Sequence, residues 1–282
     1  MPELPEAETI ARQLRGRLPG RRLKALRVRR PSVVRGEGEP LRHLVGQTVC
    51  GVRRIGKAVL VEFAEGGCLL FRLGMTGALV VDGAGPLRAH CHLVLQFEPP
   101  LRVQFVDARR FGGVYGHTAT SLAQAAEVRN LGVDPLSSAF TASWLGERLA
   151  GSRRPLKSFL MDQRVVAGIG NIYASEILFR AGLHPLRLAN SLSSAEATRL
   201  RRETVRVLRA AISHGGTTVA DYQDAEGRRG RFALRLLVYG REGEPCARCG
   251  RPIRRLVISN RSTFLCPGCQ PAPRKRARRA AG

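Results

Sequence analysis

Long apolar runs are missing from this sequence of 282 residues, and no stretch reaches the length that a membrane-spanning helix requires. The first residues are polar and rich in proline, so they lack the apolar core of a secretory signal peptide. Internal repeats and lipidation signals are absent as well. We therefore expect a cytoplasmic protein with reduced thiols and no association with membranes.

Acidic residues are scarce compared with basic ones. The chain has 22 Asp and Glu against 47 Lys and Arg, which gives a formal net charge of +25 and a pI near 11.4. This excess favours a polyanionic partner, either nucleic acid or an anionic membrane surface. Residues 228–282 alone hold 15 Arg and Lys against 2 Glu. Because no membrane segment is visible, we favour nucleic acid as the partner.

The first eighteen residues predict a short extended arm followed by an amphipathic helix. Apolar residues recur at helical spacing, at Ala7, Ile10, Ala11, Leu14 and Leu18. Pro5 suits a first helical position, and Glu6 and Glu8 suit the first turn, where acidic groups stabilise the positive end of a helix. The chain therefore presents its first residues at a helix N-terminus.

Pro2 is a candidate nucleophile, because removal of the initiator methionine before a small residue would leave it with a free secondary amine. An α-amine has a pKa near 7.7–8.0, so roughly a tenth is neutral at pH 7, and the helix N-terminus lowers that pKa further. Such an amine can attack an electrophilic carbon, with the neighbouring Glu3 placed to transfer protons. In an arbitrary protein, however, a proline at this position more often only stiffens the chain end.

Short β-like runs alternate with Gly- and Pro-containing turns between residues 23 and 115. The runs cover residues 26–28, 58–63, 68–73, 78–81, 92–97 and 101–106. This pattern predicts an antiparallel sandwich or barrel. The loops between the runs hold the polar and aromatic candidates Lys57, Met75, His90, Arg109, Arg110 and Phe111.

The pattern becomes helical in the second half of the chain. Residues 142–149 and 156–161 are short helical candidates, and Asn171 suits the N-cap of a helix that runs to about residue 181. Ser193 and Glu196 form a capping box at the start of a longer helix.

Glycines at 215 and 216 are expected to end that longer helix. Residues 217–230 are polar and non-periodic, so they form either a solvated linker or a substrate loop, and their composition alone favours a linker. Residues 232–239 are expected to form a strand.

The seven cysteines fall into two groups. Cys50, Cys68 and Cys91 are scattered through apolar runs, as is typical of buried free thiols. The other four form two Cys-x2-Cys pairs with sixteen residues between them, namely Cys246, Cys249, Cys266 and Cys269. This spacing predicts one tetrahedral zinc ion held by four thiolates, with no open position and hence a structural role.

Two short strands are expected between the cysteine pairs, over residues 256–259 and 263–265, with Asn260 and Arg261 at the turn. An arginine at the tip of a rigid hairpin can grip a phosphate, although a surface arginine is usually only solvated. Elsewhere, Phe111 follows two arginines on a loop and could enter a base stack, with Met75 as a second apolar wedge. Taken singly, each of these apolar residues is more often part of a core.

In order and spacing, these motifs closely resemble those of the bacterial formamidopyrimidine-DNA glycosylases, which are 8-oxoguanine DNA glycosylases and AP lyases. The resemblance covers residues 1–270. It includes Pro-Glu-Leu-Pro-Glu-Ala-Glu-Thr, Leu-Gly-Met-Thr-Gly, Asp-Ala-Arg-Arg-Phe-Gly, Met-Asp-Gln-Arg-Val-Val-Ala-Gly-Ile-Gly-Asn-Ile-Tyr-Ala-Ser-Glu, Gly-Gly-Thr-Thr and Cys-Pro-Gly-Cys-Gln. It implies an α+β fold with an N-terminal antiparallel β-sandwich and helix, a helix-two-turns-helix domain and a C-terminal zinc β-hairpin.

The resemblance also implies a domain arrangement. The catalytic β-sandwich domain would span residues 1–135, the helix-two-turns-helix domain 136–227 and the zinc finger 228–270. A strongly basic tail, 271–282, continues past the usual end of the family. Low hydrophobicity predicts disorder in that tail, which would add only non-specific affinity for phosphate.

Catalytic roles follow from the same resemblance. Pro2 would attack C1′ of a damaged nucleotide, expel the oxidised base and leave a Schiff base, while Glu3 donates and accepts protons. Lys57 would contact phosphate and assist β-elimination. Arg261 would do the same for δ-elimination, which leaves a one-nucleotide gap. The implied partner is double-stranded DNA with oxidised purines or abasic sites, bound by a monomer.

DNA-contact residues are implied as well. The backbone-contact positions are His90, Arg153 and Asn171. The positions that fill the space left by an everted nucleotide are Met75, Arg109 and Phe111. The loop at 217–231 would close over the everted base, and Ala220 stands there where several relatives carry a basic residue, which leaves the base preference open.

Three alternatives remain. The sister enzyme endonuclease VIII removes oxidised pyrimidines by the same amine chemistry, but Leu4 and the Arg-Arg-Phe-Gly loop argue against it. A non-catalytic DNA-binding protein would not need Pro2, Glu3, Lys57 and Arg261 together. An RNA-binding zinc-ribbon protein would explain the charge but not the N-terminal motif.

Overall fold

The structure is a computed structural model that describes residues 2–35, 41–83, 85–218 and 222–273. The chain divides into two compact units. The first comprises Met1–Gly132 and Leu208–Arg235, and the second comprises Val133–Val207 and Leu236–Gly282. Within the described residues, none of the helices combines the length and apolar character needed to cross a membrane.

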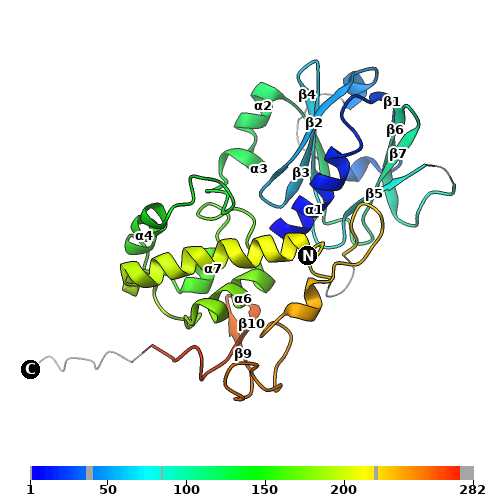
Figure 1. The fold of residues 1–282 in the computed structure, drawn as a ribbon. Coiled ribbons are helices and arrows are strands. Elements are labelled where there is room, and N and C mark those ends of the chain that lie inside the picture. Colours follow the sequence, from blue (N-terminus) through cyan, green and yellow to red (C-terminus); the bar gives the residue numbers. More distant parts are fainter. Residues whose placement is uncertain (1, 36–40, 84, 219–221, 274–282) are drawn as a thin grey trace, which may run out of the picture. The chain divides into compact units, whose positions relative to one another are not determined.

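The first unit contains two four-stranded antiparallel sheets (Figure 1). One sheet has the order β2-β3-β4-β8, with β2 (Val49–Ile55), β3 (Ala58–Phe63), β4 (Gly67–Arg72) and β8 (Gly113–Thr118). The other has the order β1-β6-β7-β5, with β1 (Arg22–Val28), β6 (Cys91–Glu98), β7 (Leu101–Val106) and β5 (Ala78–Asp82). The predicted antiparallel sandwich is confirmed. The predicted strands did not include β2 or β8, whose glycine and arginine residues break the alternating apolar pattern.

Helix α1 (Leu4–Arg15) packs its apolar face into the core of this sandwich. Its residues Ala7, Ile10, Ala11 and Leu14 are fully buried in one cluster with apolar residues of both sheets. Burial of a large aliphatic side chain contributes about 1.5–3 kcal/mol, so α1 is a structural part of the sandwich. The predicted N-terminal helix is confirmed, and its first turn is rigidly placed.

Short elements complete the first unit. Helices α2 (Ala119–Gln124) and α3 (Ala126–Arg129) follow β8, and Leu122 of α2 packs on the outer face of β3, β4 and β8. Single 3₁₀ turns occur at η1 (Pro31–Val33), η2 (Leu41–Leu44) and η4 (Phe232–Arg235).

The second unit is helical and ends in a hairpin. It contains α4 (Ala142–Ala150), α5 (Leu156–Met161), α6 (Asn171–Ala181), η3 (Ala189–Ser191) and most of α7 (Ser194–Ser213), followed by β9 (Arg254–Ile258) and β10 (Arg261–Leu265). The capping box of α7 forms as predicted, since Ser193 N–H donates to Glu196 Oε2 at 2.9 Å and Glu196 N–H donates to Ser193 Oγ at 3.3 Å.

The strand predicted over residues 232–239 is wrong. Residues 232–235 form the turn η4, and the backbone then wraps around the carboxylate of Glu176, which is fully buried in α6. That carboxylate accepts the N–H groups of Leu237, Val238 and Tyr239 at 2.9–3.0 Å. Because these N–H groups are used by a side chain, they do not pair with a neighbouring strand.

Two smaller predictions also need correction. Asn171 is the first residue of α6 and Gly170 is its N-cap, because the Asn171 amide donates to the Ser262 carbonyl instead of capping the helix. Cys68 and Cys91 are buried free thiols as predicted, but Cys50 is exposed because it lies on the solvent face of the edge strand β2. Ala220 and the tail from residue 274 onward lie outside the described residues.

Candidate active site and metal centre

The N-terminus of α1 holds Pro2 and Glu3 in buried positions. Glu3 is the N-cap, and its N–H donates to Oε2 of Glu6 at 2.7 Å. The other oxygen of Glu6 accepts the N–H of Thr217 at 2.7 Å, so one buried carboxylate binds the start of α1 to the segment after α7. The positive end of the helix stabilises these carboxylates and disfavours a cationic amine nearby.

Lys57 lies in the two-residue turn of the β2–β3 hairpin, where Ile55 pairs with Ala58. Gly56 has φ = +56°, a conformation that a hairpin turn of this length requires and that glycine adopts without strain. Arg54 fixes this turn to α1, because its guanidinium donates to the Gly56 carbonyl at 3.1 Å and to Glu8 at 3.1 Å. The turn that carries Lys57 is therefore anchored to the helix that begins with Pro2 and Glu3.

Buried Asp107 joins the loops that carry the other candidates of the first unit. One of its oxygens accepts the hydroxyl of Thr76, and the other accepts the Gly112 N–H at 2.7 Å. Its own N–H donates to the carbonyl of His90 at 3.1 Å. Met75, His90, Arg109 and Phe111 thus lie on segments that are joined through Asp107, whose role was not predicted.

Met75 and Phe111 are both exposed, with 40% and 56% of their surface accessible. The interpretation as core residues is therefore excluded for this structure. The Arg109 guanidinium lies 4.8 Å from the centre of the Phe111 ring, a cation–π distance. Gly74 allows the two loops to meet, since a Cβ there would lie 2.5 Å from the backbone at Phe111 and Gly112. Two exposed apolar side chains on rigid, adjoining loops are suited to insertion between stacked bases.

In the second unit, Arg261 is the first residue of β10 and pairs with Ile258. The turn itself consists of Ser259 and Asn260, which have φ values of +50° and +57°. This two-residue turn has positive φ at both central positions. The prediction that Arg261 lies in the turn is therefore wrong, because Arg261 directly follows it. Its side chain is exposed beside the hairpin tip.

Lys157 supports this hairpin and was not predicted as a site residue. Its side chain is buried, and Nζ donates to the Ser262 carbonyl at 3.1 Å and to the hydroxyl of Thr263. Asn171 Nδ2 donates to the same Ser262 carbonyl at 3.0 Å. The structure therefore brings Asn171 and the strand of Arg261 together. The only signal in the sequence is a lysine inside a short helix whose other residues, apart from Ser158, are apolar.

Arg153 is exposed on the segment between α4 and α5. The candidates divide between the two units. The first unit holds Pro2, Glu3, Lys57, Met75, His90, Arg109 and Phe111. The second holds Arg153, Asn171, Arg261 and the four paired cysteines.

The paired cysteines form the predicted metal centre. Their four sulfur atoms lie within 4.8 Å of one another, with Cys246 to Cys269 at 3.8 Å and Cys249 to Cys266 at 3.3 Å. A Zn–S distance of about 2.3 Å in a tetrahedron gives sulfur–sulfur distances of about 3.8 Å, so these residues fit one structural zinc ion.

Packing ties this metal centre to helix α6. Cys246 and Cys266 belong to one apolar cluster with Phe179, and the Arg248 guanidinium lies 4.5 Å from the centre of the Phe179 ring. The metal centre therefore stiffens the hairpin against α6 and offers no open coordination position for chemistry.

Comparison with known proteins agrees with this arrangement. The model of the formamidopyrimidine-DNA glycosylase N-terminal domain matches residues 1–114, and the model of the H2TH domain of the same glycosylase matches residues 131–223. A zinc finger found in FPG and IleRS matches residues 243–272.

Curated relatives match over nearly the whole chain. The formamidopyrimidine-DNA glycosylase of Cereibacter sphaeroides is 43% identical over 284 residues, which cover 96% of this chain and 100% of the relative. That of Moorella thermoacetica is 45% identical over 259 residues, which cover 91% of this chain and 94% of the relative.

Solved structures are similar as well. The MutM (FPG) protein of Thermus thermophilus has a TM-score of 0.86 and 40% identity, with 95% of this chain and 98% of that chain covered. The Lactococcus lactis Fpg in complex with DNA that contains an abasic site has a TM-score of 0.88 and 30% identity, with 96% and 100% covered. Since sandwich, helical domain and zinc finger all match in order and over nearly full length, this chain belongs to the formamidopyrimidine-DNA glycosylase family.

Proposed function

We propose that this protein is a base-excision-repair enzyme that removes oxidised purines, such as 8-oxoguanine and formamidopyrimidines, from double-stranded DNA and then cleaves the strand as an AP lyase. The observation that carries the proposal is the burial of Pro2 and Glu3 at the positive end of α1. Solved complexes of the Lactococcus lactis relative with DNA that contains Fapy-dG or an abasic site support DNA as the substrate.

The glycosylase step uses the amine of Pro2 as its nucleophile. The neutral nitrogen attacks C1′ and forms a C–N bond, while the glycosidic bond breaks and the base leaves with the electron pair and takes up a proton. Glu3 protonates the sugar ring oxygen as the ring opens, which gives an iminium between Pro2 and C1′. Because α1 is packed in the core, this amine and carboxyl group are held without large motion.

Strand cleavage follows from the iminium. Loss of a proton from C2′ expels the 3′ phosphate by β-elimination, with Lys57 binding phosphate and supplying a proton to the leaving group. A second elimination expels the 5′ phosphate, with Arg261 in the corresponding role. Hydrolysis then frees Pro2 and leaves a one-nucleotide gap with phosphates at both ends. The rigid turn of Lys57 and the zinc-held hairpin of Arg261 support these roles.

Extrusion of the damaged nucleotide needs a substitute for the lost base stacking. Met75, Arg109 and Phe111 fill the vacated space, which is consistent with the exposure of the two apolar side chains. His90, Arg153 and Asn171 contact the DNA backbone. The charge of +25 supplies non-specific affinity for the duplex. We further propose that the enzyme acts as a monomer in the cytoplasm, at the nucleoid.

Borohydride trapping tests the proposal. The purified protein is incubated with a duplex carrying 8-oxoguanine opposite cytosine, reduced, and examined by mass spectrometry of the N-terminal peptide. We expect a covalent adduct on Pro2. A matched control keeps the sequence but carries a short uncleaved N-terminal extension, which makes the Pro2 nitrogen an amide and should abolish the adduct.

Other outcomes of the trapping experiment separate the alternatives. An adduct only on an oxidised-pyrimidine duplex would move the substrate class to that of endonuclease VIII. Full binding without any adduct, in material that lacks Met1, would indicate a DNA-binding protein without the proposed chemistry.

A further inference from the structure

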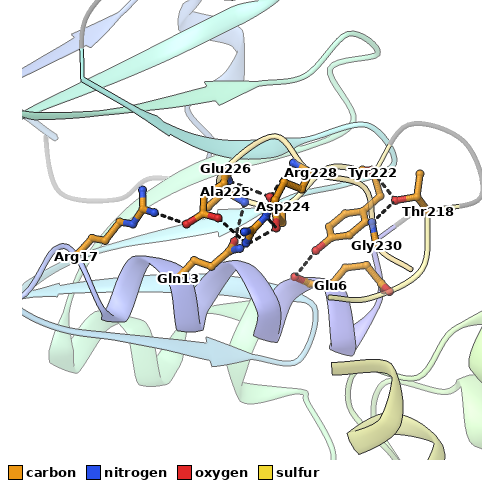
Figure 2. Close-up of polar contacts among 10 residues, drawn as sticks. All are labelled: Glu6, Gln13, Arg17, Thr218, Tyr222, Asp224, Ala225, Glu226, Arg228 and Gly230. Carbon is orange, nitrogen blue, oxygen red and sulfur yellow. Dashed lines mark hydrogen bonds and ion pairs between the residues drawn. The ribbon is translucent and has the colours of Figure 1, made fainter. Parts of the chain in front are cut away.

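Residues 222–230, called the anchored segment here, follow α7 and lie against the side of α1 (Figure 2). Composition favoured a solvated linker for this stretch, but Tyr222, Asp224 and Ala225 are buried. Three residues on one flank of α1 and just after it face the segment, namely Glu6, Gln13 and Arg17. The segment is therefore a built part of the first unit, and its anchor points lie along the helix that carries Pro2 and Glu3 at its start.

Gln13 makes the central contact through both ends of its amide. Its Nε2 donates to Asp224 Oδ2 at 2.8 Å, and its Oε1 accepts the N–H of Ala225 at 2.8 Å (Figure 2). Two hydrogen bonds to adjacent residues fix both position and orientation, which one contact could not do. Gln13 is half-buried and is not part of the apolar core, so the sandwich does not depend on it for packing.

Asp224 organises the segment around this contact. Its carboxylate also accepts the N–H groups of Glu226 at 3.0 Å and Arg228 at 2.9 Å, and the Arg228 guanidinium at 3.0 Å. Burial tends to raise the pKa of this carboxyl group, but the hydrogen bonds from Gln13 and Arg228 outweigh it, so the pKa lies below its ordinary value. Asp224 is thus a charged acceptor at neutral pH, which strengthens the bond from Gln13.

Further contacts extend the same anchorage. The Ala225 carbonyl accepts the N–H of Val81 in β5 at 2.7 Å, and Arg17 pairs with Glu226. At the other end, the Gly230 N–H donates to the hydroxyl of Thr218 at 2.8 Å. The Tyr222 hydroxyl lies 3.5 Å from the Glu6 carbonyl.

We infer that Gln13 is a positioning residue for excision of the damaged base, because it holds the anchored segment at a fixed place relative to the helix that bears the nucleophile. The inference rests on the proposed function, in which the segment belongs to the loop that receives the everted base. Gln13 is not one of the reacting groups. Its effect on the reaction depends on whether the DNA still carries a damaged base. The anchored segment matters for excision and not for cleavage of an abasic site, where no base has to be held.

Gln13→Met tests this inference, since it removes both hydrogen bonds and keeps the side-chain length. We expect kcat/KM for excision from an 8-oxoguanine duplex to fall about tenfold or more, and cleavage of a preformed abasic duplex to change less than about twofold. Arg12→Ala is the matched control on the same helix, because Arg12 is exposed and its ion pair is with Glu8 of the preceding turn, and both activities should be kept.

A double variant separates positioning from general damage. Gln13→Glu alone places a carboxylate against Asp224 and should reduce excision more than Gln13→Met. Gln13→Glu combined with Asp224→Asn restores a donor and acceptor pair with reversed direction but removes the acceptor of the Arg228 guanidinium, so we expect it to recover part of the excision rate that Gln13→Glu alone loses. Loss that is equal for both substrates, or absence of rescue, would contradict the inference.

Limited trypsin digestion gives a readout that does not involve activity. Arg228 and Arg229 are exposed and lie in the anchored segment, so Gln13→Met should speed cleavage there severalfold while Arg12→Ala does not. If Gln13→Met changes neither the digestion nor the excision rate, the inference about Gln13 is refuted while the proposed function still stands. A parent protein that processes neither duplex would refute the proposed function and this inference with it.

Discussion

Single buried carboxylates organise the functional parts of this protein. Glu6 joins the start of α1 to Thr217, Asp107 joins the loops of Met75 and Phe111, and Glu176 accepts three successive N–H groups. Each compensates its own desolvation with hydrogen bonds from groups that would otherwise be unsatisfied. Among the exposed side chains that are proposed to meet DNA, Met75 and Phe111 lie on loops that Asp107 holds together.

Arg261→Ala is the clearest test at the scale of one residue. Because the proposed role of Arg261 is confined to the second elimination, β-elimination products should persist while the δ-elimination product falls about tenfold or more. Denaturing gels of a preformed abasic substrate separate the two products by their 3′ ends. Arg255→Ala is a matched control in the same hairpin, since Arg255 is also exposed but lies away from the tip. Loss of both products in Arg261→Ala would contradict the assigned role.

At the scale of elements, turns and caps fix where the side chains point. The hairpin tip of β9 and β10 rests on Lys157 and Asn171, while the zinc centre closes the other end of the same hairpin. Helix α7 begins with the capping box of Ser193 and Glu196. The capping box acts within one helical turn, whereas Lys157 and Asn171 lie far from the hairpin along the chain and contact it only in the fold.

The α7 cap has a testable dependence on pH. The hydrogen bonds from Arg187, together with those from Ser193, lower the pKa of Glu196 to about 2. A lowered carboxyl pKa contributes stability that is present above its unfolded value of about 4.3 and is lost as the pH falls towards 2. Glu196→Gln should therefore cost about 1–2 kcal/mol of unfolding free energy at pH 7.

Urea unfolding at several pH values measures this effect. The difference between the parent and Glu196→Gln should shrink between about pH 5 and pH 2. Glu244→Gln serves as the control, since Glu244 is exposed and forms its ion pair with Arg241 of the same turn. A difference that stays constant with pH would indicate that the cap acts through packing and not through charge.

At the scale of the whole molecule, charge dominates. The net charge of +25 includes five Arg and Lys beyond residue 273. Each phosphate neutralised on duplex DNA contributes a slope of about −0.9 to the dependence of log K on log salt concentration.

Removal of residues 274–282 should therefore weaken binding to undamaged duplex DNA. It should also make that negative slope shallower, by as many as about four units. The single-turnover rate of excision at saturating enzyme should stay the same, because none of the proposed catalytic residues lies in the tail. Fluorescence anisotropy over a salt series measures the first effect and rapid quench the second. An unchanged slope would mean that the tail does not contact DNA.

The sequence by itself determined those features that depend on local order and spacing. The cysteine pairs fixed the metal and its ligand number, the apolar repeat fixed α1, and the alternating runs fixed most of the sandwich. Such features are readable because their partners lie close together along the chain or because their periodicity repeats. The roles of Pro2, Glu3, Lys57 and Arg261 came from resemblance, and they remain proposals.

Only the tertiary structure decided which distant residues meet. Gln13 and Asp224 are 211 residues apart, and Lys157 lies 105 residues before Ser262, so neither pair leaves a periodic signal. The prediction of a strand that ends at Tyr239 was wrong for the same reason, since the N–H group of Tyr239 donates to a side chain on a helix that is remote in sequence. Buried polar groups form hydrogen bonds with whichever groups the fold brings close to them. Which distant residues these are cannot be predicted from local order and spacing.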